Sequence, residues 1–507
     1  MPNFGFVIDL RKCIGCHACT IACKAEHQIP IGVNRCWVKT VERGTFPQTQ
    51  RFFFPVLCNQ CVEAPCAKIC PTNALFWRPD GIVDLHGDAC IGCRACMVAC
   101  PYDQLFIDPN THTAEKCNFC ANRVENELLP ACVSVCPTEC RIFGDLDDPA
   151  SEVARIAHDQ GASVRKPEKG TVPKVFYLGA DPSAIRPENA VRPFIYKEGQ
   201  VLLRPLASPA PDPMRAGEAR VDYDVPHEKP WGLDMALYLL TKGIATGTML
   251  VSLFLFFAFE NRDPLTMIVG PAISLLFLLI TTGLLIVDLE RPGRFYYILV
   301  RPNWRSWMVW GAYCLLAQGA IATLWLLAAW FGRNDALAWI LWPAALISVL
   351  TTCYTAFLFA QGLARDLWQG PQSIVDLLAQ AIAEGSAVMM LAALVPGVVD
   401  LRVMSPLSFA LAFAMIVHLA IVVFENILMP SPSRHHALAT AAIRRGAFAR
   451  PFWGGAILCA TVSVAAALVG AFPPSPIVLA AAALLALGGS FAWEYVWVEA
   501  GQSVPLS

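Results

Sequence analysis

The sequence predicts a small α+β domain fused to an all-α bundle of eight transmembrane helices. Sixteen of the 21 cysteines lie in four groups of four within the first 136 residues. From about residue 231 onward the chain is a succession of apolar runs. Overall 56% of the 507 residues are hydrophobic and only 15% are charged, which is outside the range of soluble domains. The chain therefore divides into a soluble part and a membrane part.

The four cysteine groups have spacings typical of ligands to [4Fe–4S] clusters. The first and third follow C-x2-C-x2-C-x3-C, the second follows C-x2-C-x4-C-x3-C, and the fourth has one long gap. In such runs three thiolates bind one cluster and the fourth binds its neighbour. Four groups therefore predict four [4Fe–4S] clusters in a tandem dicluster ferredoxin domain, a relay for single electrons. The groups are Cys13, Cys16, Cys19 and Cys23; Cys58, Cys61, Cys66 and Cys70; Cys90, Cys93, Cys96 and Cys100; and Cys117, Cys120, Cys132 and Cys136.

Disulfides and structural zinc are the alternative uses of these cysteines. Disulfides need an exported chain, and the sequence from Met1 to Phe4 has neither an apolar signal region nor twin arginines. Zinc sites rarely use four cysteines at the tight spacing of the first and third groups. Cys36 and Cys140 lie outside the groups and are expected to be small buried residues. A net charge of −2 without a basic cluster excludes nucleic-acid binding.

Short motifs around the cysteines are shared with a known family. They are Cys58-Asn59-Gln60-Cys61, Ala64-Pro65-Cys66, Cys100-Pro101-Tyr102, residues 143–149 and residues 166–171. On these motifs, residues 1–180 resemble the iron–sulfur subunits of dimethyl sulfoxide reductases and polysulfide reductases. The resemblance implies four mixed ligand sets. They are Cys13, Cys16, Cys19 with Cys136; Cys117, Cys120, Cys132 with Cys23; Cys58, Cys61, Cys66 with Cys100; and Cys90, Cys93, Cys96 with Cys70.

The chain is expected to have three parts. Residues 1–194 form the ferredoxin-type domain, and residues 195–230, rich in proline and charge, form an extended linker. Residues 231–507 form the membrane anchor, in which eight apolar stretches reach the roughly 20 residues that span hydrocarbon. The predicted spans are 233–258, 265–287, 306–331, 337–360, 376–399, 406–428, 452–472 and 476–498.

Arginines in the loops predict the orientation of the anchor. Loops on the ferredoxin side hold nine of them, and loops on the opposite side hold three. Positive loops stay in the cytoplasm, so we expect a multi-pass protein of the cytoplasmic (inner) membrane with its ferredoxin domain in the cytoplasm. The nine are Arg291, Arg294, Arg301, Arg305, Arg365, Arg434, Arg444, Arg445 and Arg450, and the three are Arg262, Arg333 and Arg402.

Ionisable residues within the spans gather in the half nearest the ferredoxin domain. Such residues are costly in a membrane and usually line a site or water path, although Asp234 and Glu494 could instead be helix ends that reach the interface. Only His418 lies where an axial haem ligand would, so membrane haem is not expected. A quinone is the simplest electron partner. Its carbonyls need hydrogen-bond donors and a proton route, which Tyr238, Lys242 and nearby acids such as Glu384 provide.

The membrane half also resembles a family. Residues 231–243 and 288–295, followed by Pro302, Ser306 and Met308, are similar to the eight-helix anchors of polysulfide and dimethyl sulfoxide reductases. The resemblance implies a quinone site (for ubiquinone or menaquinone) near the loop after the second span, which adds Asp288 and Arg291 to the candidate residues. It also implies a separate molybdopterin-containing catalytic subunit as partner, so the chain itself has no catalytic residue for the substrate.

We therefore expect a subunit that passes electrons between a molybdopterin enzyme and membrane quinone through four [4Fe–4S] clusters, without haem. Because the clusters are expected in the cytoplasm, the assembly resembles the sulfite:quinone dehydrogenases most. The alternatives are an anchor for a sulfoxide, polysulfide, phenylacetyl-CoA or formate oxidoreductase, and a redox-driven proton-translocating module. The sequence leaves the substrate and the direction of electron flow open.

Overall fold

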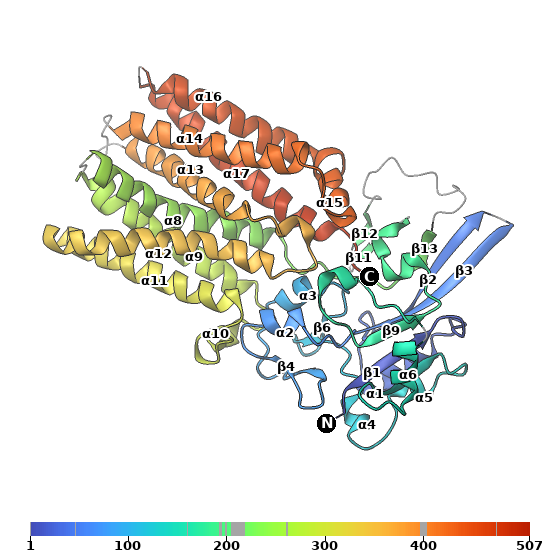
Figure 1. Ribbon diagram of the computed structural model, residues 1–507. Coiled ribbons are helices and arrows are strands. Elements are labelled where there is room, and N and C mark those ends of the chain that lie inside the picture. The colour runs from blue at the N-terminus through green and yellow to red at the C-terminus, as the bar shows by residue number, and fades with distance from the viewer. Residues whose placement is uncertain are drawn as a thin grey trace.

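The computed structural model describes residues 2–45, 47–159, 161–191, 195–197, 200–203, 219–259, 262–395, 403–472 and 474–507. A soluble part made of short strands and helices lies against one end of a bundle of long helices (Figure 1). This architecture confirms the predicted α+β domain fused to an all-α transmembrane bundle.

Two sheets organise the soluble part. In the first, β1 (Phe4–Asp9) lies between β8 (Arg141–Asp145), which is antiparallel to it, and β9 (Val175–Leu178), which is parallel. The second sheet has the order β10-β13-β2-β3, and its long hairpin extends away from the bundle (Figure 1). Its strands are β10 (Ala190–Val191), β13 (Ala219–Tyr223), β2 (Cys36–Thr45) and β3 (Gln48–Leu57). Residues 219–223 of the predicted linker therefore pair within this sheet.

Five short helices lie among the cysteines, and five of the cysteines are within them: Cys19, Cys23, Cys66, Cys96 and Cys132. The helices are α1 (Ala18–His27), α2 (Pro65–Ile69), α3 (Ala95–Ala99), α4 (Ala121–Val124) and α5 (Ala131–Ser134). A similar seven-residue motif leads into both α1 and α3, with the sequence C-I-G-C-H-A-C at the first and C-I-G-C-R-A-C at the second. The glycine of each motif has a φ of 70°. Glycine takes this left-handed conformation without a steric cost, so the loop folds back and its cysteines face a common centre. Residues 13–19 and 90–96 are thus the same local structure used twice.

Within the described residues, eight helices are long and apolar enough to cross a membrane. They agree with the eight predicted spans, although residues 396–399 of the fifth span and Arg402 lie outside the described residues. The helices are α8 (Leu233–Phe259), η3 (Leu265–Val269) with α9 (Gly270–Val287), α11 (Trp307–Trp330), α12 (Asn334–Ala360), α13 (Ser373–Ala393), α14 (Met404–Val423) with η7 (Phe424–Leu428), η8 (Pro451–Cys459) with α16 (Ala460–Gly470), and α17 (Pro476–Ser503).

The bundle consists of two four-helix halves joined through α8 and α13. The first half contains α8, α9, α11 and α12, and the second contains α13, α14, α16 and α17. Helices α8 and α13 approach closely at Gly247 and Gly385, where a Cβ atom on either glycine would overlap the backbone of the other helix. Small residues allow such close packing of membrane helices. The contact brings the polar residues of α8 and α13 next to each other.

The loop between α9 and α11 binds the soluble part. The side chain of Asn303 donates to the carbonyl oxygens of Cys70 (2.7 Å) and Ala67 (3.2 Å), and Ser306 donates to that of Ile69 (2.6 Å). The backbone N–H of Arg291 donates to the carbonyl of Ile91 at 3.2 Å. The membrane half therefore holds the backbone of two of the cysteine loops directly.

Candidate functional site

Two small cavities in the soluble part are each lined by four cysteines. The first is lined by Cys58, Cys61, Cys66 and Cys100. The second is lined by Cys70, Cys90, Cys93 and Cys96. Each set combines three cysteines of one sequence group with the last cysteine of the other, as the resemblance implied.

The two remaining predicted sets combine cysteines of the first and fourth sequence groups. We call them the outer sets, and the two sets that line the cavities the inner sets. Cys117 interacts electrostatically with Cys23, Cys120 and Cys132, so this predicted set lies together. In the remaining set Cys13 interacts with Cys19, while Cys140 contacts both Cys13 and Cys136. Cys16 is the exposed member of that set. Cys36 and Cys140 are themselves buried, as expected.

The buried thiols of these sets need a positive partner before they can be charged. Burial raises the pKa of the Cys100 thiol to about 11, so a thiolate there needs a positive counter-charge. Iron supplies that charge and is bound through thiolates in such clusters.

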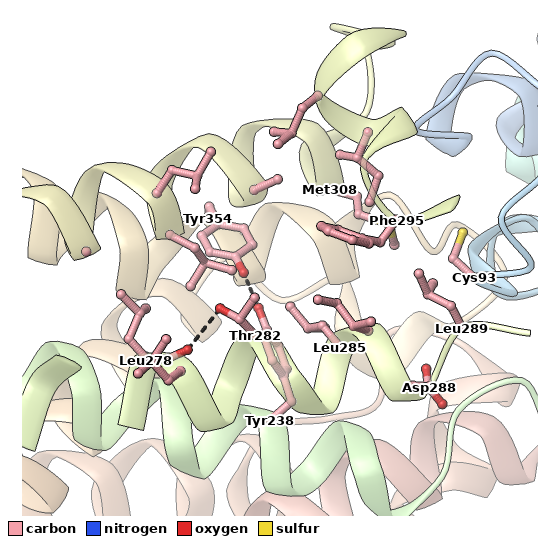
Figure 2. Close-up of a pocket in the computed structure, with 18 of the residues that line it drawn as sticks. Cys93, Tyr238, Leu278, Thr282, Leu285, Asp288, Leu289, Phe295, Met308 and Tyr354 are labelled. Atoms are coloured by element: carbon pink, nitrogen blue, oxygen red, sulfur yellow. Dashed lines mark hydrogen bonds between the residues drawn. The ribbon is translucent and has the colours of Figure 1, made fainter. Parts of the chain in front are cut away.

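A cavity of about 510 Å³ lies between the first half of the bundle and the soluble part. This volume is in the range of pockets for small organic molecules. Figure 2 shows apolar side chains along most of its wall, with Cys93 at the end that faces the soluble part. The wall is formed mainly by α8, α9, α11 and α12 and by the loop between α9 and α11. The lining includes Trp231, Met235, Tyr238, Leu278, Thr282, Leu285, Asp288, Phe295, Met308, Gly319, Thr323 and Tyr354.

Polar groups occupy two places on the wall of this membrane cavity. The hydroxyls of Tyr238 and Tyr354 are hydrogen-bonded to each other (Figure 2). Asp288 lies toward the Cys93 end, where its carboxylate accepts from Arg94 at 3.3 Å. Burial raises the pKa of Asp288 to about 6, so it can hold or release a proton near neutral pH. A ring compound bound in the cavity would have hydrogen-bonding groups near it at the tyrosine pair and at Asp288.

Two of the five predicted quinone-site residues line the cavity, namely Tyr238 and Asp288. Lys242 lies behind the tyrosines, with its Nζ 5.7 Å from the ring centre of Tyr238 and 5.4 Å from that of Tyr354. Its ammonium group donates to Thr355 Oγ1 at 2.5 Å. Arg291 does not line the cavity and meets the soluble part through its backbone.

Glu384 belongs to a second polar group inside the bundle. It is fully buried, lies beside Ser490, and interacts electrostatically with Lys242 and Asp376. Glu494 is a second buried acid, and it interacts electrostatically with Glu384. The carboxylate of Asp376 accepts a hydrogen bond from His418 Nδ1 at 2.6 Å and further hydrogen bonds from the side chains of Gln380 and Trp493. Asp234, in contrast, is exposed at the start of α8.

Sequence reasoning missed the two residues that complete the cavity. Tyr354 is a polar aromatic residue within a predicted span, and that position was a usable signal. Cys93 was predicted as a cluster ligand, but nothing in its spacing shows that it also reaches a membrane cavity. Both require the packing of α12 and of the soluble part against α8.

Comparison with known proteins covers both halves of the chain. Residues 49–146 match the family described as 4Fe-4S dicluster domain, and residues 224–505 match the family described as Polysulphide reductase, NrfD. The chain is 43% identical to the B subunit of tetrathionate reductase from Salmonella typhimurium over 201 residues, which are 39% of this chain and 80% of that protein.

Two further relatives are subunits of other reductases. The chain is 36% identical to the arsenate respiratory reductase iron-sulfur subunit ArrB of a Shewanella species over 224 residues, 35% of this chain and 96% of that protein. It is 39% identical to the B subunit of polysulfide reductase from Wolinella succinogenes over 179 residues, 35% of this chain and 94% of that protein. The resemblance of the soluble half is therefore confirmed. The chain belongs to the polysulphide reductase NrfD family and carries a 4Fe–4S dicluster domain in the same polypeptide.

Proposed function

We propose that this chain carries electrons between a molybdopterin-containing catalytic subunit and a quinone in the membrane cavity. The observation that carries the proposal is the double position of Cys93. This cysteine lines the four-cysteine cavity of the soluble part and also the membrane cavity between α8, α9, α11 and α12. A cluster held by Cys93 would therefore lie directly beside a bound quinone, and no haem is needed between them.

The four ligand sets would hold four [4Fe–4S] clusters, which supply one-electron transfer when bound. In this proposal residues 1–194 form the cluster-binding domain, residues 195–230 connect it to the membrane and residues 231–507 form the anchor. Two cavities that each gather one complete ligand set support the assignment of the inner pair. Electrostatic contact among Cys23, Cys117 and Cys132 supports one set of the outer pair.

Reduction of a quinone consumes two electrons and two protons, and oxidation of a quinol releases them. The electrons would pass one at a time at the Cys93 end of the cavity. The hydroxyls of Tyr238 and Tyr354 would hydrogen-bond one carbonyl oxygen, and Asp288 would exchange a proton near the other. Lys242 contacts both tyrosine rings and interacts with Glu384, so it would connect the cavity to the buried acids. The same groups serve either direction of electron flow.

The soluble part would face the cytoplasm from the inner membrane. Nine arginines lie in loops on its side, against Arg262, Arg333 and Arg402 on the other, and this bias is typical of cytoplasmic loops. The partner that fits this side is a cytoplasmic molybdopterin enzyme, with sulfite oxidation as the leading reaction. Ubiquinone and menaquinone would both fit a largely apolar cavity of this volume.

Filling the cavity tests the quinone site. Gly319 lines the cavity, and a side chain there meets only Leu278. We expect Gly319→Leu to abolish electron exchange between the reduced protein in liposomes and a quinone analogue, followed by stopped-flow absorbance of the clusters. Gly283→Leu is the matched control, because a side chain at Gly283 on α9 enters open space. Equal rates in the two variants would place the quinone elsewhere.

Co-purification tests the partner and the substrate. An affinity-tagged full chain isolated from its native membrane should bring with it a molybdenum-containing subunit. We expect the complex to reduce a quinone analogue with sulfite as the electron donor. Activity with formate, phenylacetyl-CoA, a sulfoxide or polysulfide instead of sulfite would reassign the partner while leaving the electron relay in place.

A further inference from the structure

Arg141 is a buried cation in the interior of the soluble part. It is the first residue of β8, paired with Ile8 of β1, and is 2% exposed. Its Nη2 donates to the Sγ of Cys36 at 3.0 Å, and its Nε and Nη1 groups have no hydrogen-bond partner. The thiols of Cys19 and Cys132 also lie within hydrogen-bonding reach of the guanidinium, so the surroundings of Arg141 are made of cysteines.

No carboxylate balances this charge among the residues that the structure describes. Arg78 contacts Asp80 and Glu125, and Arg94 contacts Asp288 and Glu290. Arg165 resembles Arg141 in having two guanidinium nitrogens without a hydrogen-bond partner, but it lies over aromatic rings and not among thiols. A buried charge without a counter-charge is strongly destabilising. The cysteines beside Arg141, as thiolates of a bound cluster, would supply the compensating negative charge.

The cysteines around Arg141 identify that group. The guanidinium interacts electrostatically with Cys19 and with Cys132. Cys19 belongs to the proposed ligand set of one outer cluster and Cys132 to that of the other. Cys36, which accepts its hydrogen bond, also contacts Cys19. Arg141 thus lies between the two outer clusters rather than beside one of them.

We propose that Arg141 is a shared counter-charge that raises the reduction potentials of both outer clusters. Reduction adds one negative charge to a cluster, and a nearby cation favours the more negative state. Charge and hydrogen bonds near the cluster sulfurs are among the factors that set such potentials. One side chain would thereby shift the potentials of both outer steps of the relay in the same direction. The inference rests on the ligand sets given under the proposed function.

Redox titration of the full chain, followed by electron paramagnetic resonance, tests the proposal. In Arg141→Gln we expect both outer clusters to become harder to reduce. The ratio of reduced to oxidised cluster at a given potential should fall about tenfold, which is about 59 mV for one electron. The inner clusters should titrate as in the unmodified protein. Arg165→Gln is the matched control, because Arg165 is equally buried but lies over the rings of Phe54 and Tyr102.

A second variant separates charge from structure. Arg141→Lys keeps the charge and should show a clearly smaller shift than Arg141→Gln. Should Arg141→Gln fail to assemble, a full tenfold shift in Arg141→Lys would still overturn the role of charge. Unchanged outer potentials in Arg141→Gln, with four clusters present by iron content, would also overturn it. Fewer than four clusters in the unmodified protein would instead contradict the proposed function.

Discussion

Replacement of Cys93 by alanine is expected to abolish electron exchange with quinone while most of the soluble part stays folded. Cys93 is the residue that lines both a four-cysteine cavity and the membrane cavity. Without it the proposed cluster of that cavity would lose a ligand at Cys93, the residue that the two cavities share. Because metal binding and folding are coupled, the loop around this cluster should lose order, while the other three ligand sets keep all their cysteines. Iron analysis should show the loss of about one cluster of four.

Cys314→Ala is the matched control for Cys93→Ala. Cys314 lies on α11 and packs against the same hydrophobic cluster as Cys93, but it belongs to no ligand set. Its variant should keep full iron content and full quinone turnover, measured by stopped-flow absorbance after reduction with dithionite. Normal quinone turnover in Cys93→Ala would show that electrons leave the soluble part by another route.

Replacement of Lys242 by methionine is expected to slow quinone turnover by roughly 10²- to 10⁴-fold, the range of a lost proton-transfer group. Methionine keeps most of the length and the apolar stem. It removes the ammonium group that contacts Thr355, the backbone of Thr352 and both tyrosine rings. All four clusters should remain, so the spectrum of the reduced protein should not change.

The pH profile decides what Lys242 does. If it delivers protons to the cavity, the variant should lose the pH dependence of quinone turnover as well as its rate. A purely structural role would lower the rate equally at every pH. Lys229→Met is the control, since Lys229 pairs with Glu499 outside the cavity. Unchanged turnover in Lys242→Met would remove this lysine from the proton route.

The architecture could be predicted because its signals are local in the sequence. Cysteine spacing carries the chemistry of cluster binding, and an apolar run about 20 residues long reports a membrane span wherever it packs. Lys242 and Glu384 were found for the same reason, since a charge within a span is visible without a structure. Arg402, which the sequence predicts on the side opposite the soluble part, lies outside the described residues.

The cavity that we propose for quinone could be predicted only in part, because its geometry depends on contacts between distant segments. The family resemblance implies that Arg291 lies near the expected site, but it does not show that the arginine meets the soluble part through its backbone. Hydropathy places Lys242 in a span without showing that two tyrosines separate it from the cavity. Asp376 and His418 form a pair 42 positions apart, and only the packing of α13 against α14 brings them together.

The hydrogen bonds from Asn303 and Ser306 to the segment around Cys70 have a consequence for biogenesis. Asn303 and Ser306 donate hydrogen bonds to backbone carbonyls of α2 and of Cys70, which follows it, and this segment contains the two cysteines Cys66 and Cys70. A polypeptide that has not yet received iron would hold these carbonyls less firmly, because its cysteine loops are not cross-linked through a cluster. Docking onto the membrane helices would then be weaker until maturation is complete. The same few hydrogen bonds that align the relay would thus act as an assembly checkpoint.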